Sequence, residues 1–218
     1  MSSDGARRFA VAGFRSIVGL AVGEEGDLWV GDGGDEMLFR LSGEGRVLES
    51  WPFEGLSSVT MLKAARVAVA SSSGCIGFFR ARCQGPLVWQ TGGRPVCVRP
   101  ARGGGLWWLD GDYPSALVRL DAGGTELLRI STYSAAKRFE VDSASGDVWI
   151  GGEGWTRCFS EEGDVMEELE CPAETARVLA VDGDSRCWVA TGTELRVVEA
   201  TGVVSRLEMR RVMDVGFP

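Results

Sequence analysis

The chain has 218 residues, 44% of them hydrophobic, and carries 23 basic against 31 acidic side chains, for a formal net charge of −8. This length and apolar content suffice for a sizeable core, while the acidic excess argues against general nucleic-acid binding and against attachment to anionic membranes. The chain contains no histidine, which excludes nucleophilic triads that depend on an imidazole base.

From the amino terminus, the pattern begins with a polar tail at residues 1–6 and an apolar strand predicted at residues 7–14. The first complete unit is predicted at residues 15–51. Inside it, an apolar run around Trp29 leads through a glycine-rich link to a second apolar run, and a turn at Gly45 precedes a third. Short apolar runs separated by turn residues predict short strands joined by tight connections.

The same pattern returns along the rest of the chain. The position of Trp29 is taken in turn by Ala68, Trp107, Trp149 and Trp188, at intervals of 39, 39, 42 and 39 residues. The corresponding units are predicted at residues 57–90, 95–130, 138–170 and 177–209. Four strands in a repeat of about forty residues are typical of a β-propeller blade. We therefore predict an all-β chain forming one β-propeller domain over residues 1–218, with four-stranded antiparallel blades. Five blades are favoured over an incomplete six-bladed ring.

Two of these copies carry a family resemblance. GDLWVGDGGDEMLFRLSGEGRVL (residues 26–48) and GDVWIGG with RCFSEEGDV (within residues 146–165) resemble NHL-type propeller repeats and the propeller repeats of bacterial two-component sensors. The resemblance covers about residues 15–209. It implies how blades pack and no particular activity, because proteins of unrelated function share such repeats.

The two ends of the chain supply more strands than five closed blades need. Residues 7–14 read as an additional outer strand and residues 210–216 as an additional inner strand. These closure strands either cover the seam of the ring or belong to an incomplete sixth blade. The second arrangement exposes strand edges, which self-association could cover.

The cysteines indicate a reducing compartment. No two of the six are spaced as a C-x-x-C pair, and the amino terminus does not resemble an export signal, so we expect reduced thiols that serve as small core residues. They are Cys75, Cys83, Cys97, Cys158, Cys171 and Cys187. No metal or other cofactor is indicated, no segment is apolar enough to span a membrane, and a cytoplasmic location is expected.

The recurring tryptophans have two interpretations. A row of aromatic side chains can stack against sugars, but residues repeated at one blade position usually pack one blade against the next. We therefore predict that Trp29, Trp107, Trp149 and Trp188 belong to the core.

Basic residues recur just before or at the start of the inner strands. They are Arg94, Lys137, Arg138, Arg177 and Arg211. Because the inner strands of a propeller surround its channel, these residues are predicted to form an anion-binding ring at the channel mouth. The alternative is that they pair with carboxylates of the links between second and third strands, namely Asp32, Asp35, Asp110, Asp112 and Glu153. Calcium binding by these acidic links is a third interpretation, although their spacing matches no known calcium loop.

Two function classes follow from this pattern. The first is a non-enzymatic binding or scaffold propeller that presents a rigid surface to a protein or a small anionic ligand. The second is a metal-dependent hydrolase or lyase, similar to lactonase-type propellers, acting at the central channel. The carboxylates available to it include Glu140, Asp142 and Asp214, but the chain lacks both the asparagine and the histidine that such propellers use.

Overall fold

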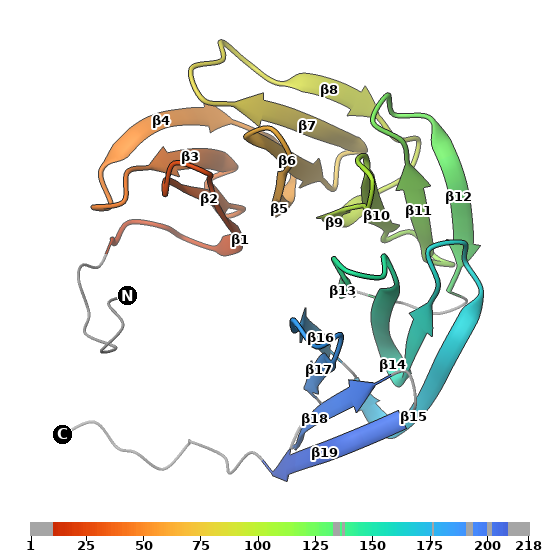
Figure 1. Ribbon diagram of the computed structural model, residues 1–218. Coiled ribbons are helices and arrows are strands. Elements are labelled where there is room, and N and C mark those ends of the chain that lie inside the picture. The colour runs from red at the N-terminus through yellow and green to blue at the C-terminus, as the bar shows by residue number, and fades with distance from the viewer. Residues whose placement is uncertain are drawn as a thin grey trace, which may run out of the picture. The chain divides into compact units, whose positions relative to one another are not determined.

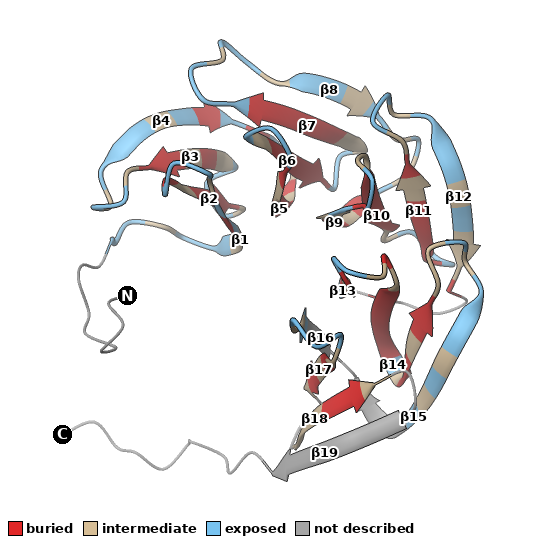
Figure 2. Cartoon of the chain, in the orientation of Figure 1, coloured by how far each residue is buried: buried red, intermediate tan, exposed pale blue. Residues whose placement is uncertain are grey.

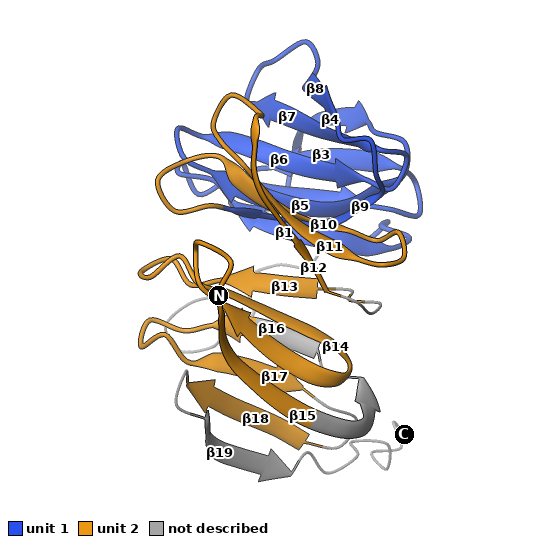
Figure 3. Cartoon of the chain, turned by 90° about the vertical axis from the view of Figure 1, so that its right-hand side faces the viewer, with its two compact units in different colours: residues 1–100 blue, residues 101–218 orange. Residues whose placement is uncertain are grey.

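A computed structural model describes residues 11–132, 136, 138–175, 177–190, 194–199 and 202–208; for residues 171–175, 177–179 and 202–208 it describes the backbone alone. All regular structure in this part of the chain is β, and no helix there is long and apolar enough to cross a membrane. The strands form five antiparallel sheets, four of them four-stranded and one three-stranded (Figure 1). The chain divides into two compact units, residues 1–100 and residues 101–218 (Figure 3).

The first unit contains two complete four-stranded meanders and one further strand. The strands are β1 (Ile17–Val22), β2 (Leu28–Asp32), β3 (Met37–Leu41), β4 (Val47–Pro52), β5 (Leu56–Leu62), β6 (Arg66–Ser71), β7 (Cys75–Arg80), β8 (Leu87–Gln90) and β9 (Pro95–Pro100). Each strand of a meander pairs antiparallel with the next one in the sequence. Strand β5 lies beside both β1 and β9, so neighbouring sheets meet at their first strands.

The second unit repeats the arrangement. Its strands are β10 (Leu106–Asp110), β11 (Ala116–Leu120), β12 (Glu126–Ser131), β13 (Arg138–Val141), β14 (Val148–Phe159), β15 (Val165–Thr175), β16 (Arg177–Val181), β17 (Cys187–Ala190), β18 (Glu194–Glu199) and β19 (Gly202–Glu208). Strand β16 lies beside β13 and β14, which brings the β13–β15 and β16–β19 sheets together.

The amino-acid pattern of each strand follows from how deeply the strand is buried. In the three sheets formed by β1–β12, the middle strands are largely buried and the fourth strands, β4, β8 and β12, are largely exposed (Figure 2). Strand β6, with the sequence RVAVAS, is buried at every residue after Arg66, whereas β8 exposes Leu87 and Val88. A strand packed on both faces is apolar at successive positions because both sets of its side chains are buried. An outer strand has one face in solvent and can therefore alternate apolar and polar residues.

Close approach between sheets depends on glycine. A Cβ at Gly19 of β1 would lie 2.7 Å from the backbone nitrogen of Val59 in β5, and one at Gly31 would lie 2.6 Å from the Val59 side chain. Both distances are shorter than any real Cβ contact, so larger residues would push β1 and β5 apart. The tryptophans fill the space beside these contacts, and the Trp29 and Trp51 rings stack with centroids 5.3 Å apart.

Three of the four tryptophans predicted to belong to the core are buried, which confirms the prediction for them. Trp29, Trp107 and Trp149 are 2%, 0% and 2% exposed, and Ala68 is fully buried. Trp188 is half-buried. The five described cysteines are free thiols, three of them buried, while Cys171 lies outside the described side chains.

The predicted all-β fold is confirmed, with one difference in the fourth unit. There β14 has 12 residues and takes the place of two expected strands: its first part pairs with β13 and its last part with β15. The segment between the two parts still pairs at Glu153, which is opposite Thr175. Gly152 and Gly154, on either side of Glu153, allow the backbone to bend sharply there. Gly154 has a φ of 80°, and a Cβ at Gly152 would lie 2.4 Å from the Trp155 ring.

The two predicted closure strands lie largely outside the described residues. Residues 11–14 contain no strand, and residues 7–10 and 210–216 lie outside the described residues. The closure of the ring and the assignment of residues 1–218 to a single domain stay predictions.

Candidate functional site

A pocket of about 260 Å³ opens in the second unit, where the β13–β15 and β16–β19 sheets adjoin. It is lined by Asp142, Ser145, Asp147, Trp149, Cys158, Asp184, Ser185 and Glu199. Four of these residues are acidic and none is basic. We refer to this site as the acidic pocket.

One wall comes from the turn that joins β13 to β14. Asp142 is buried, and its carboxylate accepts hydrogen bonds from the Ala144 backbone N–H at 2.8 Å and from the Ser185 hydroxyl. Burial alone would raise the pKa of Asp142, but these donors, together with those of Ser145, outweigh it and hold the pKa below its usual value. Asp142 is therefore a stable anion that links the two turns of the pocket.

The opposite wall comes from the turn between β16 and β17. Asp182 holds this turn: its carboxylate accepts the Trp188 indole N–H at 3.0 Å, the Arg186 Nε–H at 3.0 Å, and the backbone N–H groups of Asp184 and Arg186. The Trp188 hydrogen bond contributes most to lowering the pKa of Asp182, to about 2. Arg186 also pairs with Asp184 at 2.9 Å, so its charge is already shared between two carboxylates.

The floor of the pocket is apolar. Trp149 and Cys158 are 2% and 1% exposed and pack in a cluster with Cys187, Val189 and Val198. Burial, and then the negative charges of Asp147, Asp142 and Glu167, raise the pKa of the Cys158 thiol to about 12. The thiol therefore stays protonated at neutral pH and is a poor nucleophile.

The flanking cations neutralise the pocket only in part, chiefly at Asp184. Arg102 donates a hydrogen bond to the Ser145 carbonyl at 2.8 Å, and Arg186 pairs with Asp182 and Asp184. Among the described residues, neither Asp147 nor Glu199 has an ion-pair partner. No three acidic or cysteine side chains in the described part of the chain are placed to hold one metal ion. The arrangement favours an organic cation, which needs distributed carboxylates and an aromatic surface rather than a compact ligand set.

The predicted basic ring stays a prediction, because three of its five residues have no described side chain. Arg94 is an exposed residue immediately before β9, and Arg138 is the exposed first residue of β13. Arg177 begins β16, but its side chain is not among those described, and Lys137 and Arg211 lie outside the described residues. Arg138 is at the opposite end of β13 from Asp142, so the acidic pocket and this predicted anion site occupy different ends of the same strand.

The acidic links have structural partners in the first unit. Arg15 pairs with Asp35 at 2.9 Å, and the buried Asp32 accepts the backbone N–H groups of Arg15, Ser16 and Gly34. Of the carboxylates considered for catalysis, Asp142 lines the acidic pocket, Glu140 lies in β13 opposite Trp149, and Asp214 is outside the described residues.

Sequence reasoning missed Asp147, Cys158, Asp184 and Glu199 as pocket residues. The available signal was the repeated Gly-Asp-x-Trp motif, which occurs at Gly26–Trp29 and again at Gly146–Trp149. It was interpreted as part of the blade core.

Comparison with known proteins defines the fold. Neither the models of known families nor the curated proteins match this sequence. Among solved structures, selenomethionine-substituted virginiamycin B lyase from Staphylococcus aureus is similar with a TM-score of 0.78 and 13% identity, covering 89% of this chain and 70% of that one. The fold is of the β-propeller type. A catalytically inactive histidine-to-alanine variant of that lyase, solved with quinupristin, is similar with a TM-score of 0.76 and 13% identity. The match covers 89% of this chain and 70% of that one. A streptogramin B lyase structure is similar with a TM-score of 0.75 and 14% identity, and the match covers 89% of this chain and 69% of that one.

At this identity the likeness concerns the propeller fold alone. The sheets described above are its blades, and the NHL-type resemblance of the repeats is not specifically supported by these neighbours.

Proposed function

We propose that this propeller is a non-enzymatic binding protein that holds a small organic cation in the acidic pocket. The observation that carries the proposal is the pair of carboxylates, Asp147 and Glu199, which line the pocket beside Trp149 and have no ion-pair partner among the described residues. Unpaired carboxylates next to an aromatic face form an attractive site for a cation, because the charges and the ring quadrupole act together.

Proton-transfer chemistry is poorly supplied at this site. A general base works best with a pKa near the operating pH. The pKa of Asp142 is lowered and that of Cys158 is raised to about 12, so both move away from neutrality. The inactive variant among the neighbours lost a histidine, and this chain has none. Both facts favour binding over catalysis.

The proposal is tested by titrating the protein with methylammonium, tetramethylammonium and methylguanidinium chlorides at low ionic strength, using calorimetry and thermal melts. Binding to the native state should raise the melting temperature in a concentration-dependent way. The double variant Asp147→Asn/Glu199→Gln should bind at least tenfold more weakly. A matched control, Glu162→Gln/Asp164→Asn, removes the same charge from exposed positions of the β14–β15 turn and should change binding less than twofold.

Two results would overturn the proposal. One is that none of the three cations binds. The other is that both double variants weaken binding equally, because the effect would then reflect net charge and not the pocket.

A second candidate function is favoured by the likeness to lyases of the same fold. A metal-dependent lyase or hydrolase would have to use a carboxylate of this chain, and Asp142 is a buried carboxylate that lines the pocket. Incubation with quinupristin and a divalent metal tests it directly. Turnover by the wild type that disappears in Asp142→Asn would replace the binding proposal with an enzymatic one.

A further inference from the structure

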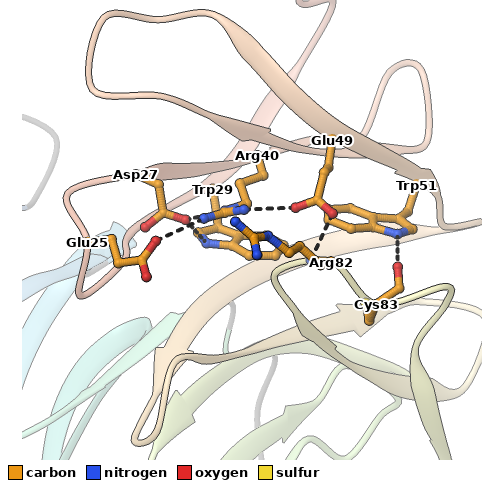
Figure 4. Close-up of polar contacts among 8 residues, drawn as sticks. All are labelled: Glu25, Asp27, Trp29, Arg40, Glu49, Trp51, Arg82 and Cys83. Atoms are coloured by element: carbon orange, nitrogen blue, oxygen red, sulfur yellow. Dashed lines mark hydrogen bonds and ion pairs between the residues drawn. The ribbon is translucent and has the colours of Figure 1, made fainter.

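The first sheet contains a guanidinium site built from its own side chains (Figure 4). Arg40 of β3 lies over Trp29, with its Cζ 6.0 Å from the ring centroid. Its Nε pairs with Asp27 at 2.5 Å and its Nη1 with Glu49 at 2.9 Å, while the Trp29 indole N–H donates to Asp27 at 3.0 Å. The Arg40 Nη2 also pairs with the exposed Glu25 at 3.4 Å, so a planar cation is held between an aromatic face and three carboxylates.

The same grouping recurs in the last sheet with an arginine from another sequence position. There the Trp188 indole N–H and the Arg186 Nε–H both donate to one oxygen of Asp182, each at 3.0 Å. A tryptophan, a carboxylate and a guanidinium therefore form a recurrent set in this protein.

A third arginine occupies the equivalent position in the β10–β12 strands. Strand pairing places Arg119 opposite Trp107, just as Arg40 is opposite Trp29. The Arg119 Cζ lies 5.9 Å from the Trp107 ring, and its guanidinium pairs with Glu161.

The β13–β15 sheet retains this site except for its arginine. Asp147 and Trp149 match Asp27 and Trp29 in the Gly-Asp-x-Trp motif. Two identical turns set the rest of the alignment: Gly45 donates to the Ser42 carbonyl in the first sheet, and Gly163 donates to the Ser160 carbonyl here.

The position that corresponds to Arg40 in the β13–β15 sheet is found by aligning Ser160 with Ser42. Two positions before Ser42 is Arg40, and two positions before Ser160 is Cys158. Strand pairing agrees, since Arg40 faces Glu49 across the β3–β4 ladder and Cys158 faces Glu167 across the β14–β15 ladder. The aspartate, the tryptophan and the outer glutamate are all present, and a short thiol replaces the guanidinium.

The acidic pocket lies where that guanidinium would be, because Asp147, Trp149 and Cys158 line it. Among the described residues, the two carboxylates that correspond to the arginine-binding Asp27 and Glu49 of the first sheet, Asp147 and Glu167, form no ion pair. The volume of about 260 Å³ far exceeds that of one water, which occupies about 30 Å³ in the liquid.

We propose that the acidic pocket binds the guanidinium group of a ligand, which takes the place of the arginine that Cys158 replaces. This inference rests on the proposed cation-binding function and specifies its ligand class. A guanidinium is favoured over an ammonium ion because its flat fork can donate to two carboxylates of the pocket, Asp147 and Glu199, on different edges while it lies beside Trp149. An ammonium ion offers no flat face and a stronger hydration shell.

The ligand preference is tested by calorimetric titration with methylguanidinium, methylammonium and the neutral isostere methylurea. Methylguanidinium should bind the wild type at least tenfold more tightly than either of the other two. Asp147→Asn should lose at least tenfold in affinity, whereas the control Glu162→Gln, which removes a charge from an exposed position outside the pocket, should bind within about twofold of the wild type. Agmatine and the tripeptide Gly-Arg-Gly then distinguish a free guanidino compound from an arginine side chain of a peptide.

A second variant supplies the missing group within the chain. Cys158→Arg should abolish methylguanidinium binding, because its own side chain occupies the site as Arg40 does in the first sheet. Circular dichroism and the melting temperature report whether this variant folds; if it does not, Glu199→Gln serves instead and should weaken methylguanidinium binding at least tenfold.

The outcomes separate the two levels of the argument. Equal binding of methylammonium and methylguanidinium, lost in Asp147→Asn, would overturn guanidinium selectivity while leaving a cation-binding pocket. Undiminished methylguanidinium binding by a folded Cys158→Arg variant would show that the ligand lies elsewhere and would overturn the inference.

Discussion

Replacing Arg40 by alanine removes the cation from the arginine site of the first sheet. The Arg40 and Asp27 side chains are each 10% exposed and that of Glu49 is 23% exposed. The variant therefore leaves one nearly buried carboxylate and one largely buried carboxylate without their partner. Breaking a buried ion pair from one side costs about 3–5 kcal/mol, since an uncompensated charge remains. For a chain of this size, that corresponds to a drop in melting temperature of roughly 6–20 °C.

The measurement is urea and thermal unfolding of the variant, with Arg129→Ala as the matched control. Arg129 also lies over a tryptophan, 5.9 Å from the Trp108 centroid, but it is 43% exposed and pairs with Glu126, which is 45% exposed. Exposed pairs contribute about 0–1 kcal/mol, so the control should change little. Added methylguanidinium should partly restore the stability of Arg40→Ala and leave that of Arg129→Ala unchanged.

The reasoning would be refuted if Arg40→Ala lost less than about 1 kcal/mol, or if the two variants lost the same amount. The first result would mean that Asp27 and Glu49 are solvated or re-paired when the guanidinium is removed. Rescue by methylurea as well as by methylguanidinium would indicate that the filled volume, and not the charge, restores stability.

Four further predictions concern other parts of the chain. Backbone N–H groups of Ser16, Arg15, Gly34 and Asp35 outweigh burial and lower the pKa of Asp32. Its contribution is therefore present above the unfolded pKa of about 3.9 and is lost as pH falls through the folded value; the stability difference between the wild type and Asp32→Asn should shrink in acid unfolding. Trp149→Ala should destabilise by about 3–5 kcal/mol, measured by urea unfolding, because the ring is 2% exposed; a loss below 1 kcal/mol would contradict its core role. Ala65→Gly should stabilise by about 0.5–1 kcal/mol in the same assay, since Ala65 has a φ of 51° and a left-handed backbone suits glycine; no gain would mean that the turn is unstrained. Arg94→Glu/Arg138→Glu should abolish any sulfate-dependent rise in melting temperature if these residues bind an anion, whereas a lower melting temperature without sulfate dependence would identify them as structural ion-pair partners.

Much of the fold could be predicted because a propeller repeats the same four-stranded unit along the chain. The interval between Trp29, Trp107, Trp149 and Trp188 is set by four strands and their turns, and each copy must bury the same middle strands. Apolar runs and turn glycines are visible in a single sequence. The strands and the buried tryptophans could therefore be predicted from the sequence without knowing which strands pair. The fourth unit departed from this pattern only where glycines at 152 and 154 let β14 continue through an expected turn.

The acidic pocket could not be found in the same way, because it is defined by a side chain that is absent. The equivalent position is occupied by Arg40 in one sheet, Arg119 in another and Cys158 in a third, at different distances along the chain from the tryptophan. The link between the two strands changes length, so spacing alone does not align these positions. Strand pairing and the serine turns do align them, since hydrogen bonds between neighbouring strands fix which side chains share a face. The sequence by itself determined the repeated scaffold, whose local pattern is legible. Only the tertiary structure decided which carboxylates have lost their guanidinium, because that depends on contacts between residues far apart in the chain.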